Sequence, residues 1–363
     1  MPPRFDIAVL GATGFTGRLI VEELRRQGVR VAAAGRRPTE LEAVAGDPAA
    51  VLRTDVRDPR SLEALAEATR VLVNTVGPFN RFGDAVADAA LAAGAHYVDT
   101  TAEQSWIRRL HQRLRTFAHD AGVAFVPAQA VDFAPALTAA HLLAQDLGAL
   151  RSLHVTHWLD QYKTSRGTAI SAIAAVSEPA FALRDGQPVL LDDLYEWSAR
   201  RHIDLPRGYR EVPFPSAEPI LLPGELNGLR DVDSYLALPG ARGHAFAVFQ
   251  KLLSGDRRPS PQHIAHLERL VAWRATDPAP AERATARWAV VARATGANGR
   301  TAALRVSGQD VYLSTARLAA NGAIRLASAS RVNGGVGSLA AALGTAAAAD
   351  CCRDSGATIE QLN

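Results

Sequence analysis

The chain has 363 residues, of which 48% are apolar, and a formal net charge of +3 at pH 7. This length suits two domains, and the apolar content excludes a disordered chain. The small charge is not gathered into a basic stripe, so we expect neither a nucleic-acid nor a membrane partner. The cysteines are the neighbours Cys351 and Cys352, and no signal-peptide pattern or membrane-spanning apolar run is evident. These features predict a cytoplasmic protein.

The first 150 residues alternate between short apolar runs and longer amphipathic segments. The predicted strands are 5–11, 29–35, 50–56, 70–77, 95–101 and 122–128. The predicted helices are 17–28, 38–46, 59–69, 83–94 and 103–121. Strands without alternation, each followed by a helix, indicate a parallel sheet covered on both faces. We therefore predict an α/β, Rossmann-type, doubly wound domain over 1–150, completed by C-terminal helices within 331–363.

The pattern changes after residue 150. Residues 151–162 alternate in polarity, and 286–308 contain two strands around an Asn298-Gly299 turn, which predicts a hairpin. We expect a connecting loop at 275–286, and two helices within 312–354 that are interrupted at 333–337. The stretch 186–262 has no clear pattern. We predict a second α+β domain over 151–330, built on a mainly antiparallel sheet, for substrate binding and as a candidate dimer contact.

The segment "AVLGATGFTGRL" places three glycines between a buried strand and a helix. Gly11 permits a tight turn, Gly14 lets the backbone approach a pyrophosphate, and Gly17 permits close helix packing. The free N–H groups of the helix N-terminus favour phosphate. A sharp turn without a ligand is the alternative. The predicted cofactor-binding residues of this loop are Gly11, Ala12, Thr13, Gly14, Phe15, Thr16 and Gly17.

The end of the second strand indicates which nucleotide is bound. An NAD site usually has an acidic residue there, but this chain has Arg36 and Arg37 and no acid before Glu40. Guanidinium groups suit a 2′-phosphate, so we predict NADP(H). Ordinary solvated arginines are the alternative. Asp55 is predicted on the adenine side, and the nicotinamide is expected near the fourth strand, at Thr75, Val76, Gly77, Pro78 and Phe79.

Reduction also needs a proton source near the cofactor. The candidates are Asp132, Tyr97, Tyr162 and Lys163. Asp132 lies in an apolar stretch, where burial would raise its pKa and suit it as a proton donor. The alternative is a structural role, in which its side chain hydrogen-bonds to the loop backbone. Tyr97 is a donor or a core aromatic, while Tyr162 and Lys163 end a strand that faces a cleft or solvent.

Two enzyme classes are disfavoured. No tyrosine is followed four residues later by lysine, so the proton-donating pair of standard short-chain dehydrogenases is missing. The histidines show neither H-x-x-x-H nor H-E-x-x-H spacing, so we expect no metal site.

Several segments together resemble a known family, the saccharopine-dehydrogenase-like NADP-binding oxidoreductases, and among them the trans-acting enoyl reductases. They are "FDIAVLGATGFTGRL", "AAAGR", "NTVGPFNRFGDAVADAALAAGAHYVDTTAE", "AQAVDFAPALTAAHLL", "SRGTAISAI" and "DVYLSTARLAANGAIRLA" with "NGGVGSLAAALG". The chain departs from the family around Asp132, and it has Ala102 where glycine is usual. The resemblance implies a Rossmann domain with an inserted substrate domain.

These observations predict an NADPH-dependent reductase of an activated double bond, either C=C conjugated to a carbonyl or C=N. The substrate is expected to be a small or carrier-linked metabolite of secondary, lipid or polyketide metabolism, bound between the two domains. The sequence does not determine whether the chain forms a homodimer. The alternative is a non-catalytic protein that senses NADP(H).

Overall fold

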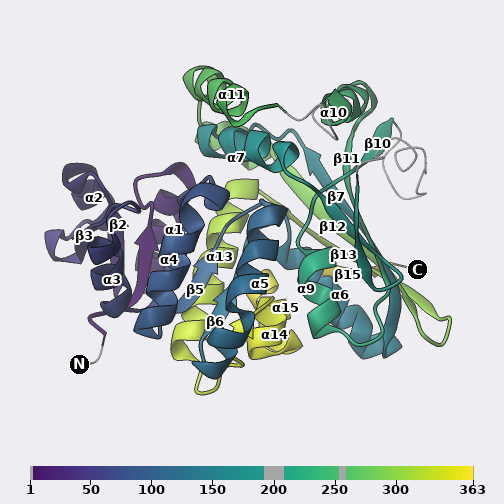
Figure 1. The fold of residues 1–363 in the computed structure, drawn as a ribbon, viewed down its shortest axis with the longest axis horizontal. Helices are drawn as coiled ribbons and strands as arrows, with labels where there is room; N and C mark the ends of the chain where they lie inside the picture. The colour runs from purple at the N-terminus through teal and green to yellow at the C-terminus, as the bar shows by residue number, and fades with distance from the viewer. Residues whose placement is uncertain (1–2, 192–207, 253–258, 363) are drawn as a thin grey trace. The chain divides into compact units, whose positions relative to one another are not determined.

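The computed structural model describes residues 3–191, 208–252 and 259–362, which form two compact units (Figure 1). Unit 1 draws on residues 1–101, 106–134 and 311–357, and unit 2 draws on 102–105, 135–310 and 358–363. These limits differ from the predicted boundaries at 150 and 330. The polypeptide crosses between the units at more points than two sequential domains require, so sequence order alone does not give the division.

Unit 1 contains a seven-stranded sheet in the order β14-β6-β5-β4-β1-β2-β3, and its strand pairs are parallel. This confirms the predicted doubly wound sheet. Its strands are β1 (Phe5–Leu10), β2 (Val31–Gly35), β3 (Val51–Arg53), β4 (Thr69–Asn74), β5 (His96–Asp99), β6 (Ala124–Val126) and β14 (Gly335–Val336). Its helices are α1 (Phe15–Arg26), α2 (Pro38–Ala45), α3 (Pro59–Glu67), α4 (Phe79–Ala93), α5 (Gln104–Asp120), α13 (Val311–Ser328), α14 (Leu339–Leu343) and α15 (Thr345–Asp354).

Helices cover both faces of this sheet, which explains why β1 and β2 are mostly apolar and buried. One face packs on α3, α4 and α5, with Leu62, Val86 and Trp106 in its core. On the other face α13 packs beside α1 and crosses β1, β4 and β5 (Figure 1). The C-terminal part of the chain therefore completes the first sheet on one side.

The predicted break at 333–337 is itself part of the sheet. Gly335 and Val336 form β14, which pairs in parallel with β6. A Cβ at Gly334 would lie 2.8 Å from the Ala118 carbonyl oxygen, so only glycine fits this close approach. Three helices, rather than the predicted two, occupy the region around it.

Unit 2 contains an eight-stranded sheet, ordered β15-β13-β12-β7-β11-β8-β9, with β10 paired to β11. Its pairs are antiparallel except β11 with β7, as the prediction of a mainly antiparallel sheet required. Its strands are β7 (Leu150–Asp160), β8 (Phe181–Arg184), β9 (Gln187–Leu190), β10 (Tyr209–Pro213), β11 (Asp231–Pro239), β12 (Arg287–Gly296), β13 (Thr301–Gln309) and β15 (Thr358–Leu362).

The hairpin predicted at Asn298-Gly299 joins β12 to β13, and Gly299 has the positive φ of 82° that its turn requires. The predicted connecting loop at 275–286 contains a short helix, α12 (Pro280–Thr285), because Pro280 occupies the first helical position, where its missing N–H costs nothing. The other helices are α6 (Ala134–Leu147), α7 (Arg166–Ser177), α9 (Glu218–Glu225), α10 (Gly240–Leu252) and α11 (Pro261–Arg274). Among the described residues, no helix is both long and apolar enough to cross a membrane.

Candidate cofactor and active site

The glycine loop has the close backbone contacts that its sequence predicts. Gly11 has a φ of +88°, and a Cβ there would lie 2.5 Å from Thr75 Oγ1. A Cβ at Gly17 would lie 2.2 Å from the Gly11 carbonyl oxygen. The loop thus turns back on its own helix and touches the end of β4, so glycine is required at positions 11 and 17.

The start of α1 is suited to an anion. Gly14 is the N-cap, no side chain caps the helix, and its first turn has no acidic residue. Unpaired N–H groups and the helix dipole favour phosphate at such an end. The exposed Gly14, together with the tight loop, leaves the backbone accessible there. These features fit the pyrophosphate of a dinucleotide.

Two arginines and a carboxylate surround Thr13 of the loop. Arg37 Nη2 donates to Thr13 Oγ1 over 3.1 Å, and Arg18 Nε donates to the Thr13 carbonyl oxygen over 3.0 Å. Glu40 ion-pairs with both, at 3.0 Å from Arg37 and 3.8 Å from Arg18. Arg36 is exposed and makes no hydrogen bond or ion pair with another described residue. Of the predicted arginine pair, Arg37 thus contacts the glycine loop, as does Arg18.

The segment just after β4 contributes backbone groups and the Thr75 hydroxyl to the candidate site. Thr75 donates from both its amide and its Oγ1 to the Leu10 carbonyl oxygen, each over 2.9 Å, which fixes this segment against the glycine loop. Phe79, by contrast, is 4% exposed and packs in the hydrophobic core. Pro78 is buried as well. Asp55 lies just past β3, where its carboxylate accepts from the Arg57 amide.

A fully buried network lies under the carboxyl ends of β4, β5 and β6. Asp99 accepts hydrogen bonds from the Tyr97 hydroxyl and the Trp106 indole, each over 2.9 Å, and from the amides of Thr101 and Ala128. Burial raises the pKa of Asp99, and burial also raises that of Tyr97 well above its ordinary value. Tyr97 is 0% exposed. This placement favours the core interpretation of Tyr97 over a proton donor.

Asp132 lies in the turn between β6 and α6. It is partly buried, and desolvation raises its pKa from 3.8 to about 6. The preceding Val131 amide donates to Thr315 Oγ1 of α13 over 3.3 Å, and Tyr312, one turn earlier in α13, meets the Phe15 ring edge-on at 4.9 Å. Helix α13 thus connects the Asp132 turn to the glycine loop within unit 1.

The two candidates from unit 2 are placed differently. Lys163 Nζ donates to both Glu282 carboxylate oxygens over 3.0 Å, and its side chain is 42% exposed. Tyr162 is partly buried just beyond β7. The bidentate pair with Glu282 gives Lys163 a structural contact within unit 2.

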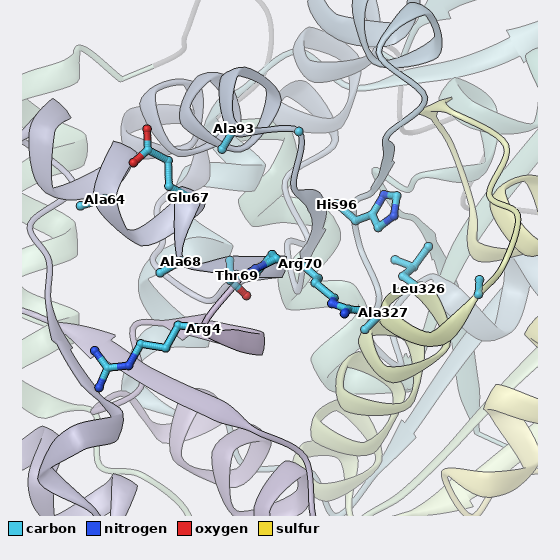
Figure 2. Close-up of a pocket in the computed structure, with 13 residues that line it drawn as sticks. Arg4, Ala64, Glu67, Ala68, Thr69, Arg70, Ala93, His96, Leu326 and Ala327 are labelled. Carbon is cyan, nitrogen blue, oxygen red and sulfur yellow. The ribbon is translucent and has the colours of Figure 1, made fainter. Parts of the chain in front are cut away.

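A cavity of about 840 Å³ lies at the edge of the first sheet where β4 and β5 begin, opposite the carboxyl ends of the strands (Figure 2). Its lining includes the first residues of β4 and β5 and the ends of α3, α4 and α13, with Arg70 and His96 among them. The predicted site residues are at the carboxyl ends of the strands, and none of them lines this cavity. Parallel α/β sheets bind ligands at the carboxyl edge, so we do not place the cofactor here.

Sequence reasoning missed Arg18, Asn74 and Trp106. Arg18 directly follows the third glycine, so its place in the first turn of a helix is a signal that was available. Asn74 and Trp106 meet only through Asp99 and Tyr97, which no local pattern reveals. In the described part of the chain, no three His, Cys, Asp or Glu side chains are grouped so that they could hold a metal ion.

Comparison with known proteins agrees with this geometry. Residues 7–126 match the family model described as the saccharopine dehydrogenase NADP binding domain. The chain is 37% identical over 147 residues to the lipid droplet localized protein of Caenorhabditis elegans, covering 37% of this chain and 34% of that protein. It is 36% identical over 139 residues to a trans-acting enoyl reductase of Mycobacterium bovis, covering 36% and 33%. The chain thus spans about a third of the length of these relatives.

The fold has a solved counterpart. The structure of apo saccharopine dehydrogenase (L-Glu forming) from Saccharomyces cerevisiae superposes with a TM-score of 0.62, covering 99% of this chain and 100% of that one, at 13% identity. This likeness shows the shared α/β fold. The glycine loop, the open helix end and the family match together identify the site as one for a nicotinamide cofactor. The family assignment covers residues 7–126, which match the saccharopine dehydrogenase NADP binding domain.

Proposed function

We propose that this protein is an NADPH-dependent reductase of an activated double bond, C=C conjugated to a carbonyl or C=N, in a small or carrier-linked metabolite. The observation that carries the proposal is that helix α13 contacts both the glycine loop, through the Phe15–Tyr312 ring contact, and the turn that holds the partly buried Asp132, through Thr315. A relative named as a trans-acting enoyl reductase supports the C=C assignment.

The arginines support NADPH over NADH. Arg36 is available to a 2′-phosphate, and Arg37 is held by Thr13 beside the loop that would carry the pyrophosphate. A guanidinium donates two parallel hydrogen bonds to a phosphate, and it gives no such advantage with a ribose hydroxyl. Charge and geometry at this position therefore favour the phosphorylated nucleotide.

The bound cofactor would supply the hydride, and Asp132 would supply the proton. With a pKa of about 6, this carboxyl group is a proton donor that is readily reprotonated from water near neutral pH. Thr315 holds the Val131 amide next to it, and Asp99 holds the Ala128 amide earlier in the same turn. The turn is therefore fixed from two sides, which keeps the donor in one place.

The cofactor assignment is tested by binding. Dissociation constants for NADPH and NADH would be measured by fluorescence titration for the wild type and for Arg36→Ala and Arg37→Ala. We expect each substitution to weaken NADPH about tenfold or more and NADH by less than about twofold. Equal losses for the two nucleotides would overturn the NADPH assignment.

The activity is tested with a panel of enals, enoyl thioesters, quinones and imines, by following NADPH oxidation. Asp132→Asn should lower kcat by about a hundredfold while leaving NADPH binding intact. Asp120→Asn, at an exposed position in α5, is the matched control and should change nothing. Tight NADPH binding with no substrate-dependent oxidation across the panel would favour a sensor of NADP(H) instead.

A further inference from the structure

The contacts around Thr13 form a closed circuit of four residues. Starting at Thr13, they run to Arg37, then to Glu40, then to Arg18 and back to Thr13. The two carboxylate oxygens of Glu40 are divided between the arginines, with Oε1 on Arg37 and Oε2 on Arg18. A single acidic side chain of α2 therefore joins Arg18 of α1 to Arg37, the N-cap residue just before α2.

The charges in this circuit are not balanced. Arg18 and Arg37 bring two positive charges to the circuit and Glu40 brings one negative charge, while the exposed Arg36 adjoins Arg37 in the sequence. The paired side chains are well exposed, at 55% for Arg18, 62% for Arg37 and 39% for Glu40. Exposed ion pairs are weak, so a doubly charged phosphate competes effectively for the same guanidinium groups.

We propose that Glu40 sets the preference between the two nucleotides by occupying Arg37 and Arg18 until a 2′-phosphate displaces it, and that Arg18 is the third basic residue of that phosphate site. This inference rests on the proposed NADPH assignment. NADH has no group that competes with Glu40, so the circuit stays closed when NADH binds. Glu40 therefore opposes the phosphorylated nucleotide only, because its carboxylate competes with and repels the phosphate.

The assignment of Arg18 follows from its two anchors. Its Nε is committed to the Thr13 carbonyl oxygen, which fixes the guanidinium plane against the loop. Its Nη2 lies 3.8 Å from Glu40 Oε2, and Arg37 Nη1 lies 3.0 Å from Oε1 of the same carboxylate. When the carboxylate moves away, two guanidinium groups remain facing one position, which is the arrangement that a phosphate needs.

The test compares dissociation constants for NADPH and NADH, measured by fluorescence titration at low salt, across matched variants of the full chain. Glu40→Gln should tighten NADPH about threefold and leave NADH within the error of the measurement. Arg18→Gln should weaken NADPH about fivefold, and Arg18→Lys should recover part of this loss. Glu42→Gln, at an exposed position in α2, and Arg25→Gln, at an exposed position in α1, are the controls.

Added salt gives an independent readout. The gain in Glu40→Gln should disappear at about 0.5 M NaCl, because the interaction is between exposed charges. Thermal unfolding without nucleotide checks that each variant is folded. Weaker NADH binding by Glu40→Gln would instead make Glu40 a ligand of the ribose hydroxyls and overturn the proposal, as would unchanged binding of both nucleotides. If Arg36→Ala and Arg37→Ala are selective for NADPH while Glu40→Gln and Arg18→Gln are silent, this inference alone fails.

Discussion

The hydroxyl of Tyr97 donates a 2.9 Å hydrogen bond to the carboxylate of Asp99, two residues later on the same strand, and both side chains are 0% exposed. Asn74 Nδ2 in turn donates to the Tyr97 oxygen over 3.2 Å, and the Asn74 side-chain oxygen accepts from the Val76 amide. The network therefore extends from the turn after β6 to the segment after β4. Its members position the sheet edge where the cofactor is expected.

Tyr97→Phe should destabilise the protein by about 1–2 kcal/mol, because the buried carboxylate of Asp99 loses one hydrogen-bond donor and the side-chain amide of Asn74 loses its acceptor. Urea denaturation measures this change. NADPH affinity should fall less than about threefold, since the three remaining donors still hold Asp99. A fall in kcat of a hundredfold or more, with stability unchanged, would return Tyr97 to the list of proton donors.

Gly17→Ala should abolish cofactor binding, because the new Cβ would lie 2.2 Å from the Gly11 carbonyl oxygen and force the loop away from α1. Stability should also fall, by about 1–3 kcal/mol, as for other overpacked sites. Gly167→Ala in α7 is the matched control, because its Cβ would find only the Ser165 oxygen, at 3.9 Å. Wild-type NADPH affinity in Gly17→Ala would show that the loop does not bind the pyrophosphate.

Asp132→Asn should stabilise the protein at neutral pH. The folded pKa of about 6 lies above the ordinary value of 3.8, so the folded state binds the proton more tightly than the unfolded state. Ionisation of Asp132 therefore costs stability as pH rises from about 4 to about 6, and the loss approaches ~3 kcal/mol at most. Urea midpoints across this range should diverge, with the variant higher above pH 6 and equal to the wild type near pH 4. Parallel curves would show that Asp132 has an ordinary pKa.

Under the proposed mechanism the wild-type kcat should fall as pH rises above about 6, because the protonated form of Asp132 is the donor. The residual activity of Asp132→Asn should not show this fall in kcat as pH rises. Stopped-flow or steady-state NADPH oxidation across pH 5–8.5 provides the comparison. An unchanged pH profile in the variant would assign the donor to another group.

Lys163→Gln should change little. Its ion pair with Glu282 is exposed, so its loss should cost no more than about 1 kcal/mol. The kcat should stay within about twofold of the wild-type value, because the structure gives Lys163 a partner inside unit 2. Glu282→Gln should reproduce the small stability change, since it removes the same pair. A large loss of kcat in Lys163→Gln alone would make this lysine part of the active site.

The sequence by itself determined the alternation of buried strands and helices that predicts a parallel sheet, the glycine loop and the hairpin at Asn298-Gly299, because each is a pattern of residues that are close in the chain. Apolar runs bounded by Gly and Pro specify buried strands, and a glycine at a tight turn is a local steric requirement. The arginine pair after the second strand was also readable, because its position relative to the loop follows from the βαβ unit.

Only the tertiary structure decided the rest, because those features depend on contacts across long sequence separations. The placement of Phe79 in the core, the bond from Trp106 to Asp99 and the strand formed by Gly335 and Val336 are of this kind. So are the ion pairs of Glu40, which joins Arg18 of α1 to Arg37, the N-cap residue of α2. A charged residue in a sequence has no fixed partner, and folding alone determines which opposite charges it meets.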